Sequence, residues 1–240
     1  MEEINDLVGF NNLKIYQNDK WFKFSVESVF LANFVTINKR CHKILDLCTG
    51  NAPIPLILTR RTTAKIIGVE IQKDIADLAI KSVKENRLLK QIEIINDNLN
   101  NMKRYYNGDD FDVITVNPPY FLNLETSSKN DDSHKTIARH EIFTNLDDIM
   151  KISSFLLKND GYFAMVHRTN RFFEIIAKLS KYNLTPKRIQ FIYPKLGKES
   201  KLFLIECSKN GKSGVKFLNP LFIQNEDGTY TKEAKEILNF

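Results

Sequence analysis

The chain has 240 residues, 42% of them hydrophobic, which is enough to bury one substantial core. No apolar run approaches the ~20 residues that a membrane span needs, and the acidic start MEEINDLVGF lacks a signal-peptide core. Three cysteines without a C-x-x-C pair and four histidines without metal spacing argue against a disulfide framework and a metal site. We therefore expect a cytoplasmic protein that contacts no membrane and holds no metal.

The formal net charge of +6 is concentrated at one end of the chain. Residues 1–45 hold 6 basic and 5 acidic side chains, residues 46–150 hold 13 and 16, and residues 151–240 hold 16 and 8. A basic end indicates a polyanionic partner such as nucleic acid. The alternative is that lysine is simply abundant here, since 26 lysines stand against 9 arginines.

The first elements expected along the chain are a hairpin and a helix. Residues 13–24 are typical of a hairpin, with strands NLKIYQ and KWFKF and a turn near Asn18-Asp19. Ser25 is expected to cap a helix over VESVFLANFV, residues 26–35.

From residue 43 onward, strand-like and helix-like segments alternate. The patterns predict helices over 53–61, 73–88, 146–158 (capped by Asn145) and 171–182, and strands over 43–47, 65–71, 92–96, 111–116, 161–167, 187–194 and 201–207. Alternation is typical of a parallel sheet covered on both faces, whereas two final strands without a helix between them are antiparallel. The sequence therefore predicts an α/β fold: a Rossmann-like doubly wound seven-stranded sheet, mostly parallel, with an antiparallel C-terminal strand pair and a small N-terminal hairpin and helix.

Polar side chains follow four successive strands, where open α/β sheets bind ligands. The first strand runs through Asp46 into a small-residue turn at 46–52, and the second ends at Glu70. The third runs into Asn96-Asp97-Asn98 and the fourth into Asn117-Pro118-Pro119-Tyr120. This set suits an adenosine ligand, which needs an acid for the ribose and a polar group for the base edge. Taken singly, each has a structural alternative: a tight connection, a solvated strand end or a helix cap.

The two prolines that end the fourth strand fix the direction of the chain, because each lacks a backbone donor and Asn117 is kept extended. The Asn117 side-chain oxygen and the Pro118 carbonyl are then two rigid acceptors, suited to both N–H groups of an exocyclic adenine amine. Tyr120 offers a flat face for base stacking. Such rigidity indicates a site rather than an ordinary loop.

These motifs resemble those of adenosylmethionine-dependent amino-methyltransferases. The whole chain resembles the bacterial tRNA(Val) (adenine-N6)-methyltransferases, which modify the adenine 3′ of the anticodon, position 37. KFSVESVFLANF is similar to their cofactor lid, DLCTGNAPIPL to the methionine loop and GVEIQKDIADLAIKSVKEN to the ribose segment. NPPYF, followed by ARHEI, is similar to the catalytic pair, and PLFIQNEDGTYT to the tail.

The resemblance implies a role for each matched residue. Asn117, Pro118 and Tyr120 would be catalytic, with Tyr120 against the target adenine. S-Adenosyl-L-methionine would be bound by Phe24, Ser25, Asp46, Gly50, Glu70, Asp97 and Asn117. One departure stands out, because Cys48 and Ala52 occupy positions where the family's loop has glycine.

The resemblance also implies a single methyltransferase domain over residues 1–240. It would consist of an N-terminal hairpin and helix (1–42), a Rossmann-like catalytic core (43–208) and a C-terminal tail (209–240). Residues 122–141 are polar and aperiodic, and a loop of that length is functional or mobile.

The expected partner is the anticodon loop of tRNA, bound by a monomer. An anticodon-loop base is already unpaired, and the chain has no room for a large domain that recognises duplex DNA. The basic stretch 178–201 also contains Tyr182, Phe191 and Tyr193, and its alternative is a solvated hairpin with aromatics facing the core. RNA contacts are expected from Tyr120, Arg139, Lys195, Lys198 and Lys201, although Arg139 could equally anchor the long loop.

Three other functions stay open at this point. A protein glutamine N5-methyltransferase also uses NPPY, but carries a longer N-terminal domain. A DNA adenine-N6 methyltransferase is disfavoured by size. A non-catalytic RNA-binding protein would result if Cys48 and Ala52 made the cofactor loop degenerate.

Overall fold

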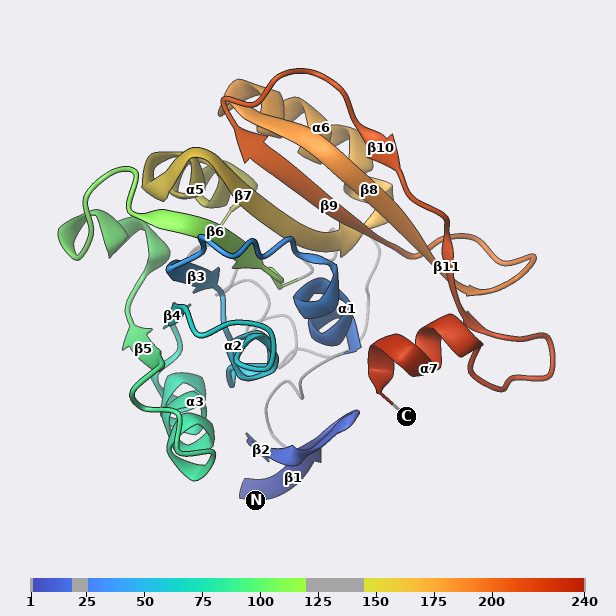
Figure 1. Cartoon of the computed structure of the whole chain (residues 1–240), viewed down its shortest axis with the longest axis horizontal. Helices are drawn as coiled ribbons and strands as arrows, with labels where there is room; N and C mark the ends of the chain where they lie inside the picture. Colours follow the sequence, from blue (N-terminus) through green and yellow to red (C-terminus); the bar gives the residue numbers. More distant parts are fainter. Residues whose placement is uncertain (1, 19–25, 120–144, 240) are drawn as a thin grey trace, which may run out of the picture.

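The computed structural model describes residues 2–18, 26–119 and 145–239, which form the α/β architecture shown in Figure 1. A nine-stranded sheet lies at its centre in the order β10-β8-β9-β7-β6-β3-β4-β5, with β11 beside β8. Strands β3 to β7 are parallel, and β9 is antiparallel to both of its neighbours. The strands are β3 (Lys43–Leu47), β4 (Lys65–Glu70), β5 (Ile92–Asn96), β6 (Phe111–Val116), β7 (Leu157–Arg168), β8 (Leu184–Lys195), β9 (Leu202–Lys209), β10 (Lys216–Phe217) and β11 (Leu221–Gln224).

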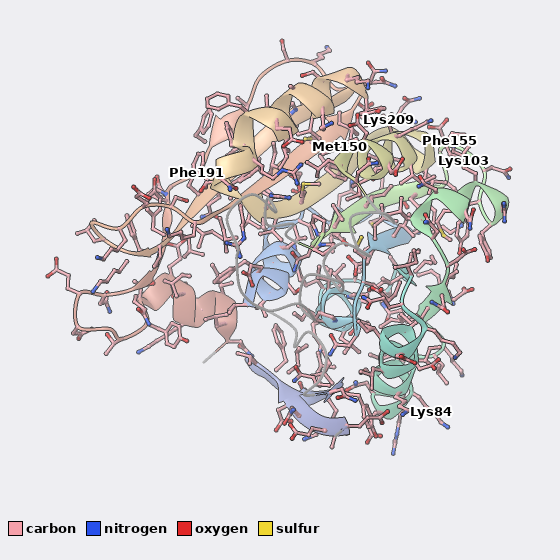
Figure 2. The ribbon with its side chains drawn as sticks, turned by 180° about the vertical axis from the view of Figure 1, so that it is seen from behind. Lys84, Lys103, Met150, Phe155, Phe191 and Lys209 are labelled. Atoms are coloured by element: carbon pink, nitrogen blue, oxygen red, sulfur yellow. The ribbon has the colours of Figure 1, made fainter. Side chains whose placement is uncertain are left out.

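The predicted fold is confirmed: all seven expected strands are present, with the expected antiparallel finish. Helices cover both faces because alternate strand residues, such as Ile44 and Leu45, enter separate apolar cores. One face carries α1 (Val26–Phe34), α2 (Pro53–Leu58), α3 (Lys73–Glu85) and α7 (Lys232–Leu238). The other carries the 3-10 helix η1 (Leu99–Arg104), α5 (Leu146–Leu156) and α6 (Phe172–Lys181). Figure 2, the view from behind, labels Met150 on α5.

The N-terminal hairpin pairs β1 (Glu2–Leu7) with β2 (Phe10–Asn18). The predicted strand NLKIYQ is confirmed as part of β2, but its described partner precedes it, which no sequence pattern indicated. Only Leu7 of β1 is buried, so EEINDL shows no alternating strand pattern. The expected turn near Asn18-Asp19 and the arm KWFKF fall on residues 19–25, outside the described residues.

The C-terminal tail adds two short strands that were not expected. β10 and β11 pair in parallel with successive parts of β8 and so cover the open edge of the sheet. Two residues in β10 and four in β11 are too few for a periodic signal. In the described part of the chain, no helix has the length and apolar character needed to cross a membrane.

The two ends of the chain meet beside α1. Gly9, which turns the hairpin with φ +77°, accepts a hydrogen bond on its carbonyl from the Asn239 side chain. Asn33 of α1 donates to the carbonyl of Ile237, at 3.2 Å. The hairpin, α1 and α7 therefore form one packed unit at the edge of the first core (Figure 1).

We expect Gly9→Ala to lower the free energy of unfolding by at least about 2 kcal/mol. The added Cβ would lie 1.5 Å from the Leu238 carbonyl oxygen, so α7 would have to move. Urea denaturation measures the loss. Gly197→Ala is the matched control, because Gly197 has φ +75° and nothing within 4 Å of an added Cβ. The control should show only the left-handed backbone cost of about 1 kcal/mol; equal losses in the two variants would contradict the steric argument.

Candidate active site

The carboxyl ends of β3, β4, β5 and β6 lie at one edge of the sheet. β3 is central: Leu47 is in register with Val69 of β4 on one side and with Val116 of β6 on the other. The residues that follow, Glu70 and Asn117, therefore flank the end of β3. The predicted site residues on these four strands are brought to the same edge.

The loop after β3 has a left-handed backbone at three of its five residues. Cys48, Gly50 and Ala52 have φ values of 56°, 59° and 72°. A residue with a Cβ adopts this region at a cost of roughly 1–2 kcal/mol, so Cys48 and Ala52 carry strain that glycine would avoid. Backbone hydrogen bonds hold the loop, from Thr49 N to Val69 O at 2.9 Å and from Ala52 N to Thr49 O at 3.0 Å. The loop thus has a backbone shape that glycine favours, although only one of its three left-handed residues is a glycine.

Glu70 is buried and holds the loop from the neighbouring strand. Its two carboxylate oxygens accept hydrogen bonds from the backbone N–H groups of Gly50 at 3.0 Å and Gln72 at 2.9 Å. Burial raises the pKa of this carboxyl above its ordinary value, against the effect of these hydrogen bonds. The alternative that Glu70 is only a solvated strand end is therefore wrong.

Asp46 lies directly beneath the loop and is fully buried. Its two oxygens accept hydrogen bonds from the hydroxyls of Thr49 and Thr115, each at 2.6 Å. Burial raises the pKa of Asp46 to about 7, although both hydrogen bonds oppose the shift. The charge of Asp46, beneath the loop, therefore changes close to neutral pH.

Asp97 lies at the rim, at the start of η1. Its carboxylate accepts hydrogen bonds from the side chain of Asn101 and the backbone of Asn98, both at 2.7 Å, and from the Tyr105 hydroxyl at 2.9 Å. These hydrogen bonds, the one from Asn101 foremost, lower the pKa of Asp97. Asn98 caps η1, as expected if this segment served as a helix cap. Asp97 fixes the position of η1 through its bonds to Asn101 and Tyr105.

Asn117 follows β6, and a residue that the sequence analysis did not select holds its side chain. The Asn117 Nδ2 donates to the hydroxyl of Ser28 on α1, at 3.0 Å. Ser28 is only 4% exposed, and five of the six residues that follow it in α1 are also buried. A serine within so apolar a helix is the sequence signal that could have identified it.

Three charged side chains fix the C-terminal end of α1, and the sequence analysis missed them too. Arg61 donates to the carbonyls of Ala32 and Val35, and Arg188 donates to that of Phe34. Glu206 of β9, 1% exposed, accepts from the Arg188 Nε at 2.8 Å and from the backbone and hydroxyl of Thr36. The end of α1 is thereby tied to α2 and to the antiparallel strands.

The predicted RNA-contacting lysines lie at the same edge of the sheet as the site. Lys195 ends β8, and Lys198 and Lys201 lie in the connection to β9. Leu202 is in register with Arg168 at the carboxyl end of β7, and Thr169 donates to the carbonyls of Lys201 and Ser200. Figure 1 shows this connection projecting beyond the end of β7.

The aromatic residues of the basic stretch 178–201 pack against other residues of the protein, which agrees with the alternative that this stretch is a hairpin with its aromatics facing the core. Phe191, labelled in Figure 2, packs against Phe172 with ring centroids 5.5 Å apart. Tyr193 packs against Phe222 at 5.2 Å, and Tyr182 donates to Asp147. The four remaining predicted site residues, Phe24, Ser25, Tyr120 and Arg139, lie outside the described residues.

The described residues include no group of three or more His, Cys, Asp or Glu side chains placed to hold a metal ion. The site instead combines a strained small-residue loop, two buried carboxylates and an asparagine fixed at a strand end. These features, on this sheet order, fit an S-adenosyl-L-methionine-dependent methyltransferase, and sequence comparison shows that class. A family described as "Methyltransferase domain" matches residues 38–235, and the chain belongs to it.

Curated relatives confirm the resemblance predicted from the motifs. The chain is 27% identical to the tRNA1(Val) (adenine(37)-N6)-methyltransferase of Bacteroides thetaiotaomicron over 235 residues, 97% of this chain and 95% of that protein. The enzyme of the same name from Parabacteroides distasonis is 27% identical over 207 residues, 85% of this chain and 84% of that protein. A crystal structure of a predicted O-methyltransferase from Agrobacterium tumefaciens has a TM-score of 0.72 at 19% identity, covering 88% and 95% of the two chains. That last likeness concerns the fold alone.

We expect adenosylmethionine to bind more tightly as the pH rises from about 5.5 to about 7.5, by up to about tenfold per unit. The cofactor is cationic and so favours the ionised form of Asp46, which is mostly protonated below its pKa of about 7. Titration calorimetry across this range measures the effect.

Asp46→Asn is the control: because the amide does not titrate, the affinity of this variant for adenosylmethionine should hardly change with pH. Glu70→Gln measures how much of the pH dependence comes from the second buried carboxyl, whose pKa is also raised. An Asp46→Asn variant that keeps the parent's slope would contradict the assignment to Asp46.

Proposed function

We propose that this methyltransferase transfers the methyl group of S-adenosyl-L-methionine to the N6 amine of an adenine in tRNA, adenine 37 of tRNA(Val). The observation that carries the proposal is the Asn117 side chain, held by Ser28 at the end of β6 beside the buried carboxylates. The names of the relatives that match nearly the whole chain support the same substrate.

Asn117 and Pro118 would hold the target amine. Because the Asn117 Nδ2 donates to Ser28, its Oδ1 is the amide atom that would accept one amine N–H. The Pro118 carbonyl would accept the other, on backbone that two prolines keep rigid. Two acceptors favour a pyramidal nitrogen with its lone pair directed at the donor methyl. Most of the rate gain would then come from orientation, where effective molarity supplies roughly 7–11 kcal/mol.

The cofactor would lie over the loop that follows β3, and it supplies the activated methyl group. Glu70 would accept from the ribose hydroxyls: it uses one site on each oxygen for Gly50 and Gln72, and a carboxylate has about four acceptor sites. Asp46 would stabilise the positive charge of the cofactor from beneath the loop. Gly50 allows close approach, because nothing lies within 4 Å of where a Cβ would be. Asp97, at the rim, would contact the adenosine, and Phe24 and Ser25 would close over it.

An anticodon loop suits the substrate side of this edge. Its bases are unpaired, so the enzyme avoids the cost of opening a duplex. The exposed β8–β9 connection beyond β7 would contact phosphates through Lys195, Lys198 and Lys201, with Tyr120 stacking on the target base and Arg139 assisting. A tRNA substrate also implies action in the cytoplasm.

We further propose that residues 1–240 act as one methyltransferase domain. The ties between α1 and β8, β9 and α7 support this, because the N-terminal extension and the tail both pack on the catalytic core.

The direct test is methyl transfer from labelled adenosylmethionine to total tRNA, followed by nucleoside analysis and sequencing of the modified species. We expect N6-methyladenosine in tRNA(Val) at position 37. Parallel reactions with duplex DNA and with glutamine-containing peptides cover the two other methyl acceptors. Label in either of those, with none in tRNA, would overturn the proposal, as would cofactor binding without transfer to any acceptor.

We expect Asn117→Ala to reduce methyl transfer below about a tenth of the parent rate, since ~1.4 kcal/mol of transition-state stabilisation is tenfold. The affinity for adenosylmethionine should stay within a few-fold, because the lost acceptor serves the target amine. Single-turnover rates and calorimetry measure the two quantities. A variant with more than a tenth of the parent activity would remove Asn117 from the mechanism.

We expect Ser28→Val to lower kcat about three- to tenfold relative to Ser28→Thr, because valine removes the hydrogen bond to Asn117. Valine and threonine match in shape, so the pair isolates the hydroxyl. In an Asn117→Asp background the two should differ little, because the carboxylate oxygens are equivalent and no amide needs orienting. Equal kcat for Val and Thr in the parent background would show that Ser28 only fills space.

Replacing Lys195, Lys198 and Lys201 together by Ala should weaken tRNA binding and reduce the slope of log K against log[salt] by about 2–3 units. The control replaces three exposed lysines near the opposite edge, Lys39, Lys84 and Lys90 (Lys84 is labelled in Figure 2), which gives the same change of net charge. Binding over a range of salt concentrations measures both. Equal slopes in the two triple variants would show that charge alone, not position, explains the binding.

A further inference from the structure

Phe173, at the start of α6, is 85% exposed, more than any other large apolar side chain in the described part of the chain. The helical spacing explains why it faces outward: Phe172, Ile175, Ile176 and Leu179 face the second core, and Phe173 lies off that stripe. Nothing in the fold requires an aromatic residue at this position. A single exposed apolar residue is ordinary in itself, so the position of the ring decides what it can do.

The residues beneath Phe173 hold it in place. Phe172 contacts Phe203 and Phe191 with ring centroids 5.0 and 5.5 Å apart, and so anchors the first turn of α6 on the sheet. The Phe173 ring stands edge-on to that of Phe172, at 5.6 Å and an interplanar angle of 78°. The exposed ring is therefore presented from a packed aromatic base rather than from a loop.

Phe173 also lies at the same edge of the sheet as Asn117. β7 neighbours β6, and only the 3-10 turn η2 (Thr169–Arg171) separates the end of β7 from α6. The same turn is bonded to the β8–β9 connection through Thr169. Asn117 and Phe173 thus follow adjacent strands of the sheet, Asn117 directly after Val116, which is in register with Met165, and Phe173 eight residues after Met165.

The surroundings of Phe173 are basic. Arg168 is exposed at the end of β7, and Lys198 and Lys201 are exposed on the adjoining connection. Neither lysine forms an ion pair with another residue among those described. The acids here are Glu174, which is paired with Arg171 at 2.7 Å, and Glu199, which is exposed between the two lysines. An exposed apolar ring and basic side chains at one edge of the sheet are the combination that binds single-stranded nucleic acid, by stacking bases and contacting phosphates.

We propose that Phe173 is a stacking platform for an unpaired base of the anticodon loop, one that flanks the methylated adenine. This inference rests on the proposed function and adds a contact with the RNA outside the methyl-transfer site. The stack would hold the neighbouring nucleotide while the target base approaches Asn117 at the end of β6. Because every base has a π-face, Phe173 would add affinity and orientation rather than sequence choice.

The experiment measures binding of an anticodon stem-loop of tRNA(Val) to the parent and to Phe173→Ala, each with S-adenosylhomocysteine bound. One base stack is worth about a 5- to 150-fold change in affinity, and we expect a loss in that range. The salt slope should stay that of the parent, since stacking neutralises no phosphate, in contrast to the lysine variants. Phe173→Trp should restore binding.

Phe217→Ala is the matched control, because Phe217 is also an exposed phenylalanine, 65% accessible, but pairs on β10 beside Ile189 in the middle of β8. A stem-loop with 2-aminopurine next to the target adenine gives a direct signal: its fluorescence should be quenched by the parent and not by Phe173→Ala. Parent-like affinity and quenching in Phe173→Ala would overturn the inference while leaving the proposed function intact. A changed salt slope would also overturn it, by assigning the loss to charge. If the parent itself neither binds nor methylates the stem-loop, the proposed function fails, and this inference fails with it.

Discussion

The ion pair between the buried Glu206 and the partly exposed Arg188 is the constraint on which the geometry of the site depends. A buried carboxylate is stable only when its oxygens are fully bonded, and Thr36 and Arg188 together bond both. Arg188 and Arg61 meanwhile satisfy the carbonyls that α1 leaves unpaired at its last turn. The helix is thereby fixed across the sheet, and Ser28 on it is fixed against Asn117. Orientation of the Asn117 amide therefore depends on charges at the far end of the helix.

The cofactor side of the site depends on a second balance, between strain and buried charge. Cys48 and Ala52 hold left-handed backbone that glycine would adopt without cost, and Glu70 offsets part of that cost by accepting the Gly50 N–H. Glu70 and Asp46 are both buried with raised pKa values, so the crevice is poised to gain from a cationic ligand. The same few residues set both the shape of the loop and its electrostatics, so a substitution at one of them alters the loop around the others.

Strand and helix patterns predicted most of this architecture, because buried parallel strands and amphipathic helices impose strong periodicity. They also predicted that Asp46, Glu70, Asp97 and Asn117 share an edge, since parallel strand ends must. Failures occurred where periodicity is absent: β1 is polar at all but Leu7, and β10 and β11 are too short. Glu206 could not be assigned from sequence, because its partner Thr36 lies 170 residues away. Ser28 could have been noticed as a serine in an apolar helix, but not its partner Asn117, 89 residues away. Phe173 could have been noticed, since it stands next to the apolar stripe of α6.

The contact between Gly9 and Asn239 has a consequence for how the enzyme is made. These residues are separated by 230 positions, and α7 also contacts α1 through Asn33. The anchors Arg188 and Glu206 come from the last third of the chain as well. During synthesis α1 and α2 leave the ribosome early and can pack on each other, whereas Arg188 follows Phe34 by 154 residues, and Glu206 and α7 come later still. The helix therefore lacks these later contacts until they have emerged. The position of Ser28 against Asn117 thus depends on residues that are synthesised after both of them.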